Sequence, residues 1–238
     1  DLDMGMNDWV CDKFDWNDSY KYNRGKVLSK DDLDKMENFG RYLDTDNDGI
    51  CYRTYPGTHP DKGAFFTRGT SHDEFARYTE DGDINAATLT RLMKKFRTAS
   101  ELVPEPVIEI NGEDSCGVIF YGSTTPAVHE AKDILKKKEI NIDLMQIRSF
   151  PFNLDVWEFI ANHDRIYVVE QNRDSQMRTL IMAEGGISPE ILRPLVHFTG
   201  DPIQASYIVN KISEREVNYK SHINACLLYT SDAADEAS

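Results

Sequence analysis

The segment CGVIFYGSTTPAVHEAKDILKKK, residues 116–138, decides the fold class. It begins with a continuous apolar run, residues 116–121, that ends in a Gly-Ser pair, and this pattern is typical of a buried parallel strand with its exit turn. A Thr-Pro pair then opens a helix, which ends in three lysines that complement the helix dipole. Apolar residues recur in it at helical spacing, at Ala127, Ala131, Ile134 and Leu135. The segment therefore predicts one strand and helix of an α/β fold.

The same cycle repeats three times toward the C-terminus. We expect strands at 142–147, 165–169 and 195–198, alternating with helices at 154–161, 175–183 and 202–212. Short apolar strands that alternate with amphipathic helices imply right-handed crossovers, and so a parallel sheet that helices cover on both faces. The sequence predicts one α/β domain over this region.

The first hundred residues show a different pattern, in which two helices flank a long irregular stretch. A capping box, Ser29-x-x-Asp32, opens a short helix that we expect to stop at Gly40. A longer helix is expected over residues 85–102. Its apolar face consists of Leu89, Leu92, Met93, Phe96 and Ala99. Residues 44–84 lack periodicity, and a loop of that length in a compact domain is usually functional or part of an interface.

Two prolines mark the expected domain boundary. Pro104-Glu105-Pro106 follows the second helix, and proline removes backbone donors and disfavours helix in the residue before it. We therefore expect domains at 1–103 and 104–217, followed by a tail at 218–238. Within that tail, CLLYTSDAADE at 226–236 resembles a translated sequencing adapter, so we interpret residues 226–238 as an artefact and leave them out of the fold. The alternative is a genuine polar tail.

Composition restricts the class of protein. The chain has 238 residues, of which 40% are hydrophobic, so it can bury one large or two modest cores. Its net charge of -14 disfavours binding to nucleic acid or anionic lipid, and no apolar run approaches the roughly 20 residues of a membrane helix. Four widely scattered cysteines agree with a reducing, cytoplasmic setting and disfavour a zinc or iron–sulfur site made by this chain alone. Because the chain begins at Asp1, without Met, we expect a fragment.

An acidic run suggests a calcium site. Asp44, Asp46 and Asp48, followed by Gly49, match the first half of an EF-hand loop. The second half fails, because position twelve is Tyr55 where the pattern needs a bidentate glutamate. The alternative is a turn in which Asp and Asn side chains cap their own backbone. A non-catalytic calcium-binding module remains the minor hypothesis.

The stretch YRTYPGTHPDKGAFFTRGTSHDEFARY, residues 52–78, is the second candidate region. Four Lys or Arg meet three Asp or Glu there, and six of its 27 residues are aromatic. Its glycines permit turns that expose Arg68, whose guanidinium suits a carboxylate or phosphate. The stretch could face an anionic substrate or a partner subunit. Alternatively, the arginines Arg53, Arg68 and Arg77 simply pair with Asp61, Asp73 and Glu74.

Two polar turns follow expected strands. Residues 122–125 lie at a helix N-terminus, where free N–H groups bind anions, but no glycine-rich fingerprint or P-loop lysine accompanies them. A plain turn is favoured there, and a helix N-cap region is favoured for residues 170–174. Three histidines of the expected second domain lie near expected element ends and are interpreted as structural: His129, His163 and His197.

Several motifs together carry a family resemblance. They are Asp1-Leu-Asp-Met-Gly5-Met-Asn7, Gly40-Arg-Tyr-Leu-Asp44, Asp48-Gly-Ile-x-Tyr52-Arg-Thr, Pro56-Gly-Thr-His-Pro60, Phe66-Thr-Arg-Gly-Thr70-x-His72, Ala76-Arg-Tyr78 and Val168-Val-Glu-Gln-Asn-Arg173. The chain resembles, over residues 1–212, the alpha subunit of 2-oxoacid:ferredoxin oxidoreductases, most closely the 2-oxoglutarate type. The run from 52 to 78 is the most specific part.

The resemblance implies a chemistry. Enzymes of this family use thiamine pyrophosphate to decarboxylate a 2-oxoacid, pass electrons singly through a [4Fe-4S] cluster to ferredoxin, and transfer the acyl group to coenzyme A. The cofactor carries the hard step, while protein supplies placement and electrostatics. In this family the beta subunit holds most of the cofactor groups: the diphosphate of thiamine pyrophosphate, Mg²⁺ and the cluster. This chain alone is therefore expected to be inactive.

The resemblance also assigns the two domains. Residues 1–103 would be the last part of the thiamine pyrimidine-side domain, and 104–217 a domain similar to the transketolase C-terminal domain. The catalytic residues would lie upstream of Asp1, so none is named here. Thr58, His59, Arg68 and His72 are the residues that we expect to face the active site or a partner subunit. Another transketolase-like thiamine enzyme is a further alternative, and the particular 2-oxoacid, reaction direction and oligomeric state stay open.

Overall fold

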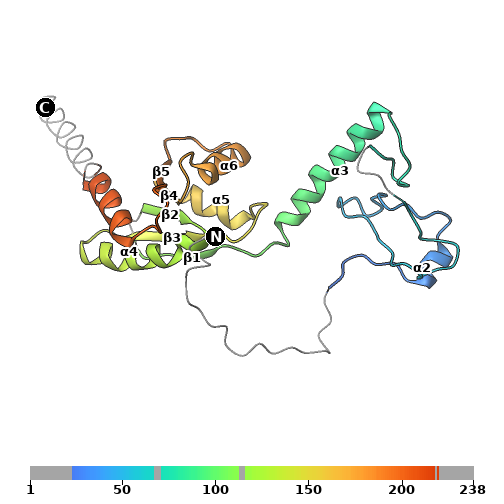
Figure 1. Ribbon diagram of the computed structural model, residues 1–238, viewed down its shortest axis with the longest axis horizontal. Coiled ribbons are helices and arrows are strands. Elements are labelled where there is room, and N and C mark those ends of the chain that lie inside the picture. Colours follow the sequence, from blue (N-terminus) through green and yellow to red (C-terminus); the bar gives the residue numbers. More distant parts are fainter. Residues whose placement is uncertain (1–22, 67–70, 113–115, 218, 220–238) are drawn as a thin grey trace, which may run out of the picture. The chain divides into compact units, whose positions relative to one another are not determined.

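The computed structural model describes residues 23–66, 71–112, 116–217 and 219, and it divides the chain into two compact units (Figure 1). The boundary between them lies between Val103 and Pro104. We call the described residues before this boundary the N-terminal unit and those after it the C-terminal unit. In the described part of the chain, no helix combines the length and apolar character that a membrane span needs.

The C-terminal unit is built on a five-stranded sheet with the order β1-β3-β2-β4-β5. Its strands are β1 (Val107–Glu109), β2 (Cys116–Phe120), β3 (Ile142–Gln146), β4 (Ile166–Glu170) and β5 (Leu192–Val196). Strands β2 to β5 pair in parallel, as predicted. The short edge strand β1 was not predicted, and it pairs with β3 in the antiparallel sense. Three residues are too few to show a period, and antiparallel edge strands are common on otherwise parallel sheets.

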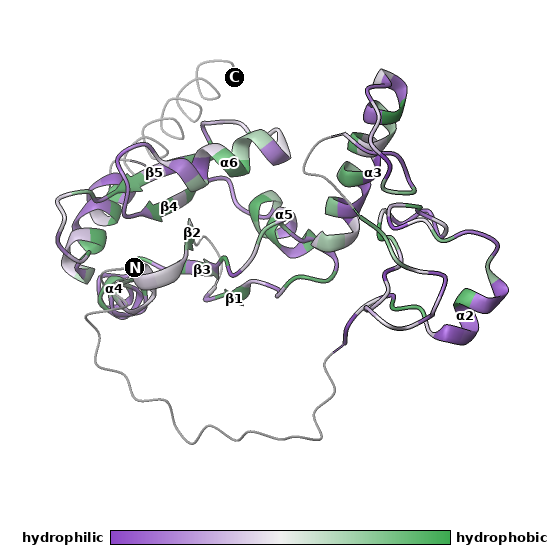
Figure 2. Ribbon diagram, turned by 45° about the vertical axis from the view of Figure 1, so that its right-hand side comes forward, coloured by the Kyte–Doolittle hydropathy of each residue, from purple (hydrophilic) through white to green (hydrophobic). Residues whose placement is uncertain are grey.

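Helices cover both faces of this sheet, as predicted. They are α4 (Thr125–Lys137), α5 (Leu154–Ala161), α6 (Gln176–Gly185) and a last helix over residues 205–217. Helix α4 and the last helix pack with Val118 and Phe120 in one core cluster, while α5 and α6 pack with Ile119 in the other. Alternate residues of one strand thus serve opposite faces. The apolar character of α5 is visible in Figure 2.

The fourth strand and helix of the cycle lie at other residues than the sequence predicted. Strand β5 begins at Leu192, whereas the prediction placed it at 195–198, and the last helix covers 205–217 instead of 202–212. Because β5 lies at the sheet edge, it tolerates Pro194 and half-exposed Arg193, and these two residues interrupt the apolar run in the sequence.

In the N-terminal unit, the short helix α2 (Lys30–Lys35) begins as predicted. The Ser29 hydroxyl accepts from the Asp32 N–H at 3.2 Å, and the Asp32 carboxylate accepts from the Ser29 N–H at 2.9 Å. The predicted end at Gly40 is wrong, because Met36 is already extended. Gly40 instead permits close packing, since a Cβ there would lie 2.8 Å from the Leu43 Cβ and 2.9 Å from the Glu74 carbonyl oxygen.

Helix α3 (Gly82–Ser100) begins earlier than the predicted 85–102, because the Asp81 carboxylate caps the N–H groups of Asp83 and Ile84 at 2.9 and 3.2 Å. Its predicted apolar face is largely exposed to solvent. No residue of the helix is buried, and three large apolar side chains are more than half exposed: Leu89, Met93 and Phe96. Between α2 and α3, the described residues form turns and isolated bridges but no further helix or strand.

Candidate functional site

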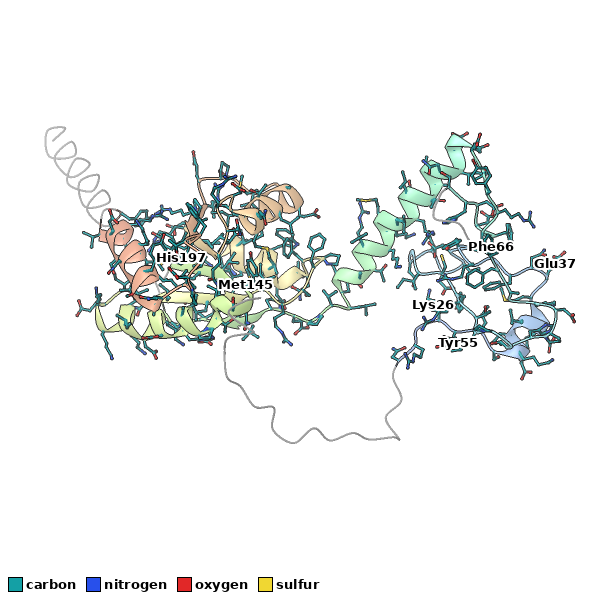
Figure 3. The ribbon with its side chains drawn as sticks, viewed as in Figure 1. Lys26, Glu37, Tyr55, Phe66, Met145 and His197 are labelled. Atoms are coloured by element: carbon teal, nitrogen blue, oxygen red, sulfur yellow. The ribbon has the colours of Figure 1, made fainter. Side chains whose placement is uncertain are left out.

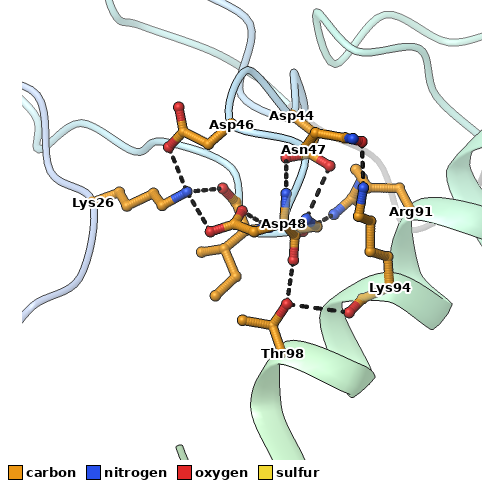
Figure 4. Close-up of polar contacts among 10 residues, drawn as sticks. Lys26, Asp44, Asp46, Asn47, Asp48, Arg91, Lys94 and Thr98 are labelled. Carbon is orange, nitrogen blue, oxygen red and sulfur yellow. Dashed lines mark hydrogen bonds and ion pairs between the residues drawn. The ribbon is translucent and has the colours of Figure 1, made fainter. Parts of the chain in front are cut away.

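The acidic turn at residues 44–50 caps its own backbone (Figure 4). The Asp44 carboxylate accepts from the N–H groups of Asp48 and Gly49 at 3.1 and 2.9 Å. The Asp48 carboxylate accepts from the Ile50 N–H at 2.9 Å. These contacts are those of the self-capping turn that the sequence analysis kept as the alternative to a calcium loop.

Lys26 supplies a cation to this turn. Its ammonium group lies 2.6 Å from an Asp46 oxygen and 2.7 Å from an Asp48 oxygen, and it also donates to the Ile50 carbonyl at 3.2 Å. Desolvation opposes the charged ammonium, but the bonds to both carboxylates outweigh it and raise the pKa of Lys26. Hydrogen bonds from Lys26 lower the pKa of both aspartates. In the part of the chain that the structure describes, no group of three or more Cys, His, Asp or Glu side chains is arranged around a metal position.

Helix α3 holds the acidic turn in place. Lys94 donates to the Asn47 side chain, Thr98 donates to the Asp48 carbonyl, and Arg91 Nη1 donates to the Gly49 carbonyl at 3.1 Å (Figure 4). Gly49 has a φ of +82°, and a Cβ at this position would lie 2.3 Å from the Lys95 backbone nitrogen. Glycine is therefore required by both backbone conformation and the close approach of the helix.

His59 joins helix α2 to the backbone of residues 61 and 62. Its Nδ1 accepts from the N–H groups of Asp61 and Lys62 at 3.0 and 2.9 Å, so the ring proton lies on Nε2, which faces Asp34 Oδ1 at 2.9 Å. The side chain is only 8% exposed. Hydrogen bonds from Lys30 and then His59 lower the pKa of Asp34. These contacts describe a histidine that organises the loop.

The other predicted loop residues have separate positions. Thr58 donates to the Tyr55 carbonyl at 2.8 Å. Thr58 and His59 both line a cavity of about 350 Å³. His72 does not line that cavity. Its ring stacks on Tyr42 with centroids 3.9 Å apart. Arg68 lies outside the described residues. Phe66, two positions earlier in the sequence and labelled in Figure 3, is 78% exposed.

For the described arginines of this loop, Arg53 and Arg77, the structure shows other contacts than the ion pairs considered as an alternative. Arg53 donates to the Arg24 carbonyl and lies over the Tyr55 ring, while Arg77 lies over the Phe75 ring. The Asp73 carboxylate accepts from the backbone N–H groups of residues 75 and 77. Among the described residues, ring contacts and turn capping thus stand in place of the ion pairs that were the alternative for this loop.

A cavity with cationic walls was missed by the sequence analysis. It has a volume of about 500 Å³, and the described residues that line it include six Lys or Arg and no Asp or Glu. The six are Arg24, Lys26, Arg41, Arg53, Arg91 and Lys95. We call it the cationic cavity. A partial signal exists in the sequence, because Arg91 and Lys95 are four residues apart and so share one face of a helix.

The polar turns of the C-terminal unit bind one another. Buried Glu170 accepts from the N–H groups of Met177 and Arg178 at 2.8 and 3.0 Å, so it caps α6 from the end of β4. The N-cap interpretation is confirmed, although the capping carboxylate comes from the strand. Gln171 donates to the Ser123 hydroxyl at 3.1 Å and so joins the two turns. These groups are engaged with protein, which supports the plain-turn interpretation.

His163 and a buried ion pair stabilise the same unit. Both ring nitrogens of His163 face oxygens, the Phe159 carbonyl at 2.7 Å and an Asp143 carboxylate oxygen at 3.1 Å. Arg165 donates to Glu216 at 3.0 Å, and the Tyr167 hydroxyl donates to the same carboxylate at 2.8 Å. The sequence analysis interpreted His163 as structural but did not foresee the Arg165–Glu216 pair, whose members are far apart in the sequence.

Comparisons with known proteins identify relatives of the chain. No protein-family model matches it. A 2-oxoacid:ferredoxin oxidoreductase alpha subunit from Aeropyrum pernix is 26% identical over 195 residues, which is 79% of this chain and 28% of the relative. The chain is homologous to such alpha subunits. A second alpha subunit, from Saccharolobus solfataricus, is 24% identical over 72% of this chain and 27% of its own length. The chain thus spans less than a third of the curated relatives that it matches.

A solved structure gives the same relationship at the level of fold. The 2-oxoglutarate:ferredoxin oxidoreductase from Magnetococcus marinus, solved with 2-oxoglutarate, coenzyme A and succinyl-CoA bound, superposes with a TM-score of 0.66 at 24% identity, covering 76% of this chain and 31% of that one. The predicted resemblance to the oxidoreductase alpha subunits is confirmed. The mostly parallel five-stranded sheet is consistent with the transketolase C-terminal-like domain that the resemblance implied.

Proposed function

We propose that this chain is part of the alpha subunit of a thiamine pyrophosphate-dependent 2-oxoacid:ferredoxin oxidoreductase that acts on 2-oxoglutarate. The observation that carries the proposal is the 26% identity with an alpha subunit over 195 residues. The complete enzyme would release CO₂, form an acyl-CoA, and transfer the electrons to ferredoxin in the cytoplasm. Thiamine pyrophosphate, when bound, supplies the electron sink for decarboxylation.

The described residues do not fit the metal groups of that enzyme. Cys116 is fully buried in the sheet, where desolvation raises the pKa of its thiol to about 12, so it is unsuited to bind a cluster as thiolate. Desolvation also raises the pKa of Cys51. We therefore assign Mg²⁺, the [4Fe-4S] cluster and most contacts to thiamine pyrophosphate to the beta subunit, and no reaction step to these cysteines.

The N-terminal unit has the surface of an incomplete domain. Among its described residues, only Leu28, Leu33 and Ala76 are buried apolar side chains, while α3 exposes an apolar face. Exposed apolar surface of this kind marks a contact with other protein. We propose that residues 1–103 end the pyrimidine-side domain and that the rest of the subunit covers α3. Residues 104–217 form the second domain.

The loop of Thr58, His59, Arg68 and His72 is proposed to face substrate or the beta subunit. Three aromatic side chains beside it are exposed by more than two-fifths: Tyr55, Phe65 and Phe66. Rings that are exposed in one chain are suited to become anchors in an interface. His59 would serve there by holding the loop rather than by proton transfer, because backbone donors occupy its Nδ1.

The test is turnover by a complete enzyme. The full-length alpha subunit that contains these residues, expressed with its beta subunit, should reduce ferredoxin or a viologen dye when 2-oxoglutarate and coenzyme A are both present. The 238-residue chain alone should show no turnover. A panel of other 2-oxoacids measures substrate preference, and absence of dye reduction with every 2-oxoacid would reject the proposal.

A further inference from the structure

The cationic cavity is exceptional in a chain of this charge. The whole sequence carries a net charge of -14, yet among the described residues six Lys or Arg and no Asp or Glu line this cavity of about 500 Å³. It lies within the N-terminal unit, between the segment that begins at Asn23, the turn at residues 49–51 and the second half of α3. Clustered like charges are costly, so their convergence calls for a compensating anion.

Not all six cations are available for a ligand. Lys26 is neutralised by Asp46 and Asp48, and Arg53 donates to the Arg24 carbonyl. Arg91 donates one N–H to the Gly49 carbonyl, and that bond does not use the other donors of its guanidinium. Asp44, the nearest other carboxylate of the turn, accepts from backbone N–H groups of residues 48 and 49.

Arg41 and Lys95 are the least committed cations. Within residues 23–66 and 71–112, the Arg41 guanidinium makes ring contacts with Tyr42 and Phe65, and no salt bridge joins either Arg41 or Lys95 to a carboxylate. Ring stacking leaves the in-plane donors of an arginine free to bind oxygen atoms.

The thiol of Cys51 shows that these cations converge. This half-buried side chain lines the cavity. Burial is the main cause that raises the pKa of its thiol, and the charges of Arg91, Asp44, Arg41 and Lys95 also act on it, so three cations and one carboxylate lie near the sulfur. The three cations come from two segments, one before the acidic turn and one on α3. Arg91 and Thr98 of α3 donate to the carbonyls of Gly49 and Asp48, and these bonds hold the helix against the turn.

We propose that the cationic cavity binds the diphosphate group of a small soluble ligand, through Arg41, Arg91 and Lys95. Two guanidinium groups match phosphate oxygens with paired N–H donors, and the ammonium adds a point charge. Three cations complement a group that carries several negative charges better than a single carboxylate. The ligand would be either free pyrophosphate or a nucleoside diphosphate. This inference does not depend on the proposed enzymatic function.

The experiment titrates sodium pyrophosphate into the 238-residue chain at low salt, with calorimetry as readout. Binding should be saturable and should weaken with added NaCl. Arg91→Gln and Lys95→Gln should each weaken binding about tenfold, because each removes one charge-assisted contact. Arg41→Lys keeps the charge but loses the paired donors, so it should fall between wild type and these variants.

Arg97→Gln is the matched control. Arg97 lies on the same helix and carries the same charge, but it is exposed and does not line the cavity. Its substitution should leave pyrophosphate affinity within about twofold of wild type. Circular dichroism checks that each variant is folded. Should Arg91→Gln disturb the turn that it contacts, Lys95→Gln still decides the matter.

Three results would overturn the proposal: no saturable heat up to about 10 mM pyrophosphate, an equal loss in Arg97→Gln and Lys95→Gln, or tighter binding of 2-oxoglutarate than of pyrophosphate. An ADP titration separates the two ligand sources. ADP that binds at least as tightly as pyrophosphate supports a nucleoside diphosphate, and weaker ADP supports free pyrophosphate.

Discussion

Lys26 shows how one residue decides the character of a motif. Its ammonium group lies between the Asp46 and Asp48 carboxylates, at the place where the half-matching calcium pattern would require an ion. Nothing in the acidic run itself indicates this, because Lys26 lies in a separate segment of the chain. The counter-charge of the turn therefore comes from another segment of the same chain.

The Lys26 pairing predicts a pH dependence. The pKa of each aspartate is lowered in the folded chain, so the stabilisation is complete above the ordinary value of 3.8 and is lost as pH falls through the lowered values. The pKa of Lys26 is raised, so its contribution is complete below 10.5 and is lost as pH rises through the raised value. In Lys26→Met, NMR titration should show the Asp46 and Asp48 midpoints moving upward. Unchanged midpoints would contradict the pairing.

A calcium titration tests whether Lys26 prevents the acidic turn from binding calcium. Because Lys26 occupies the two carboxylates, calorimetry with about 1 mM CaCl₂ should give no saturable heat, a concentration at which even weak extracellular-type sites bind. The Lys26→Met chain serves as the comparison. Saturable calcium binding to the wild-type chain would restore the calcium-module hypothesis.

At the scale of elements, the connections between strands and helices carry much of the stability. Glu170 is buried at the end of β4, and its two oxygens accept from the N–H groups of Met177 and Arg178 in the first turn of α6. In Glu170→Gln, an amide N–H₂ must face one of these donors. We expect a loss of about 1–3 kcal/mol in the free energy of unfolding, measured with urea. Glu184→Gln, an exposed change on α6, should stay within about 0.5 kcal/mol; equal effects of the two would contradict the capping role.

The last helix is joined to the sheet by the Arg165–Glu216 pair. The Glu216 side chain is 3% exposed, so Arg165→Met leaves a buried carboxylate without its cation. We expect the free energy of unfolding to fall by about 3–5 kcal/mol. The double variant Arg165→Met, Glu216→Leu removes both charges and should recover most of that loss. A single variant as stable as the wild type would show that the pair does not hold this helix.

Sequence patterns predicted some elements closely and others poorly, for physical reasons. Helices α4 and α5 begin where they were expected, because local signals such as the proline in the first turn of α4 fix their ends. The edge strand β1 is too short to show a pattern. The cationic cavity joins Arg41 to α3 across about fifty residues, and such proximity is set by tertiary packing rather than by local spacing. Fold class followed from local patterns, whereas the site depended on contacts between distant segments.

At the scale of the molecule, the two units should differ in stability. The C-terminal unit has two core clusters, whereas the described residues of the N-terminal unit bury few apolar side chains. Amide hydrogen exchange of the 238-residue chain should therefore be at least about tenfold slower in β2 to β4 than in α3. In the complete subunit with its partner, α3 should become protected. Equal protection of α3 in both preparations would contradict the proposal that other protein covers its apolar face.

We propose that these two units belong to an enzyme that couples decarboxylation to electron transfer. The most direct measurement is the product ratio in one preparation of the complete alpha and beta subunits, supplied with 2-oxoglutarate, coenzyme A and oxidised ferredoxin. Oxidation of the substrate releases two electrons, so each CO₂ should appear with one succinyl-CoA and two reduced ferredoxins. Release of CO₂ without reduced ferredoxin would contradict the claim and assign the chain to another class of thiamine enzyme.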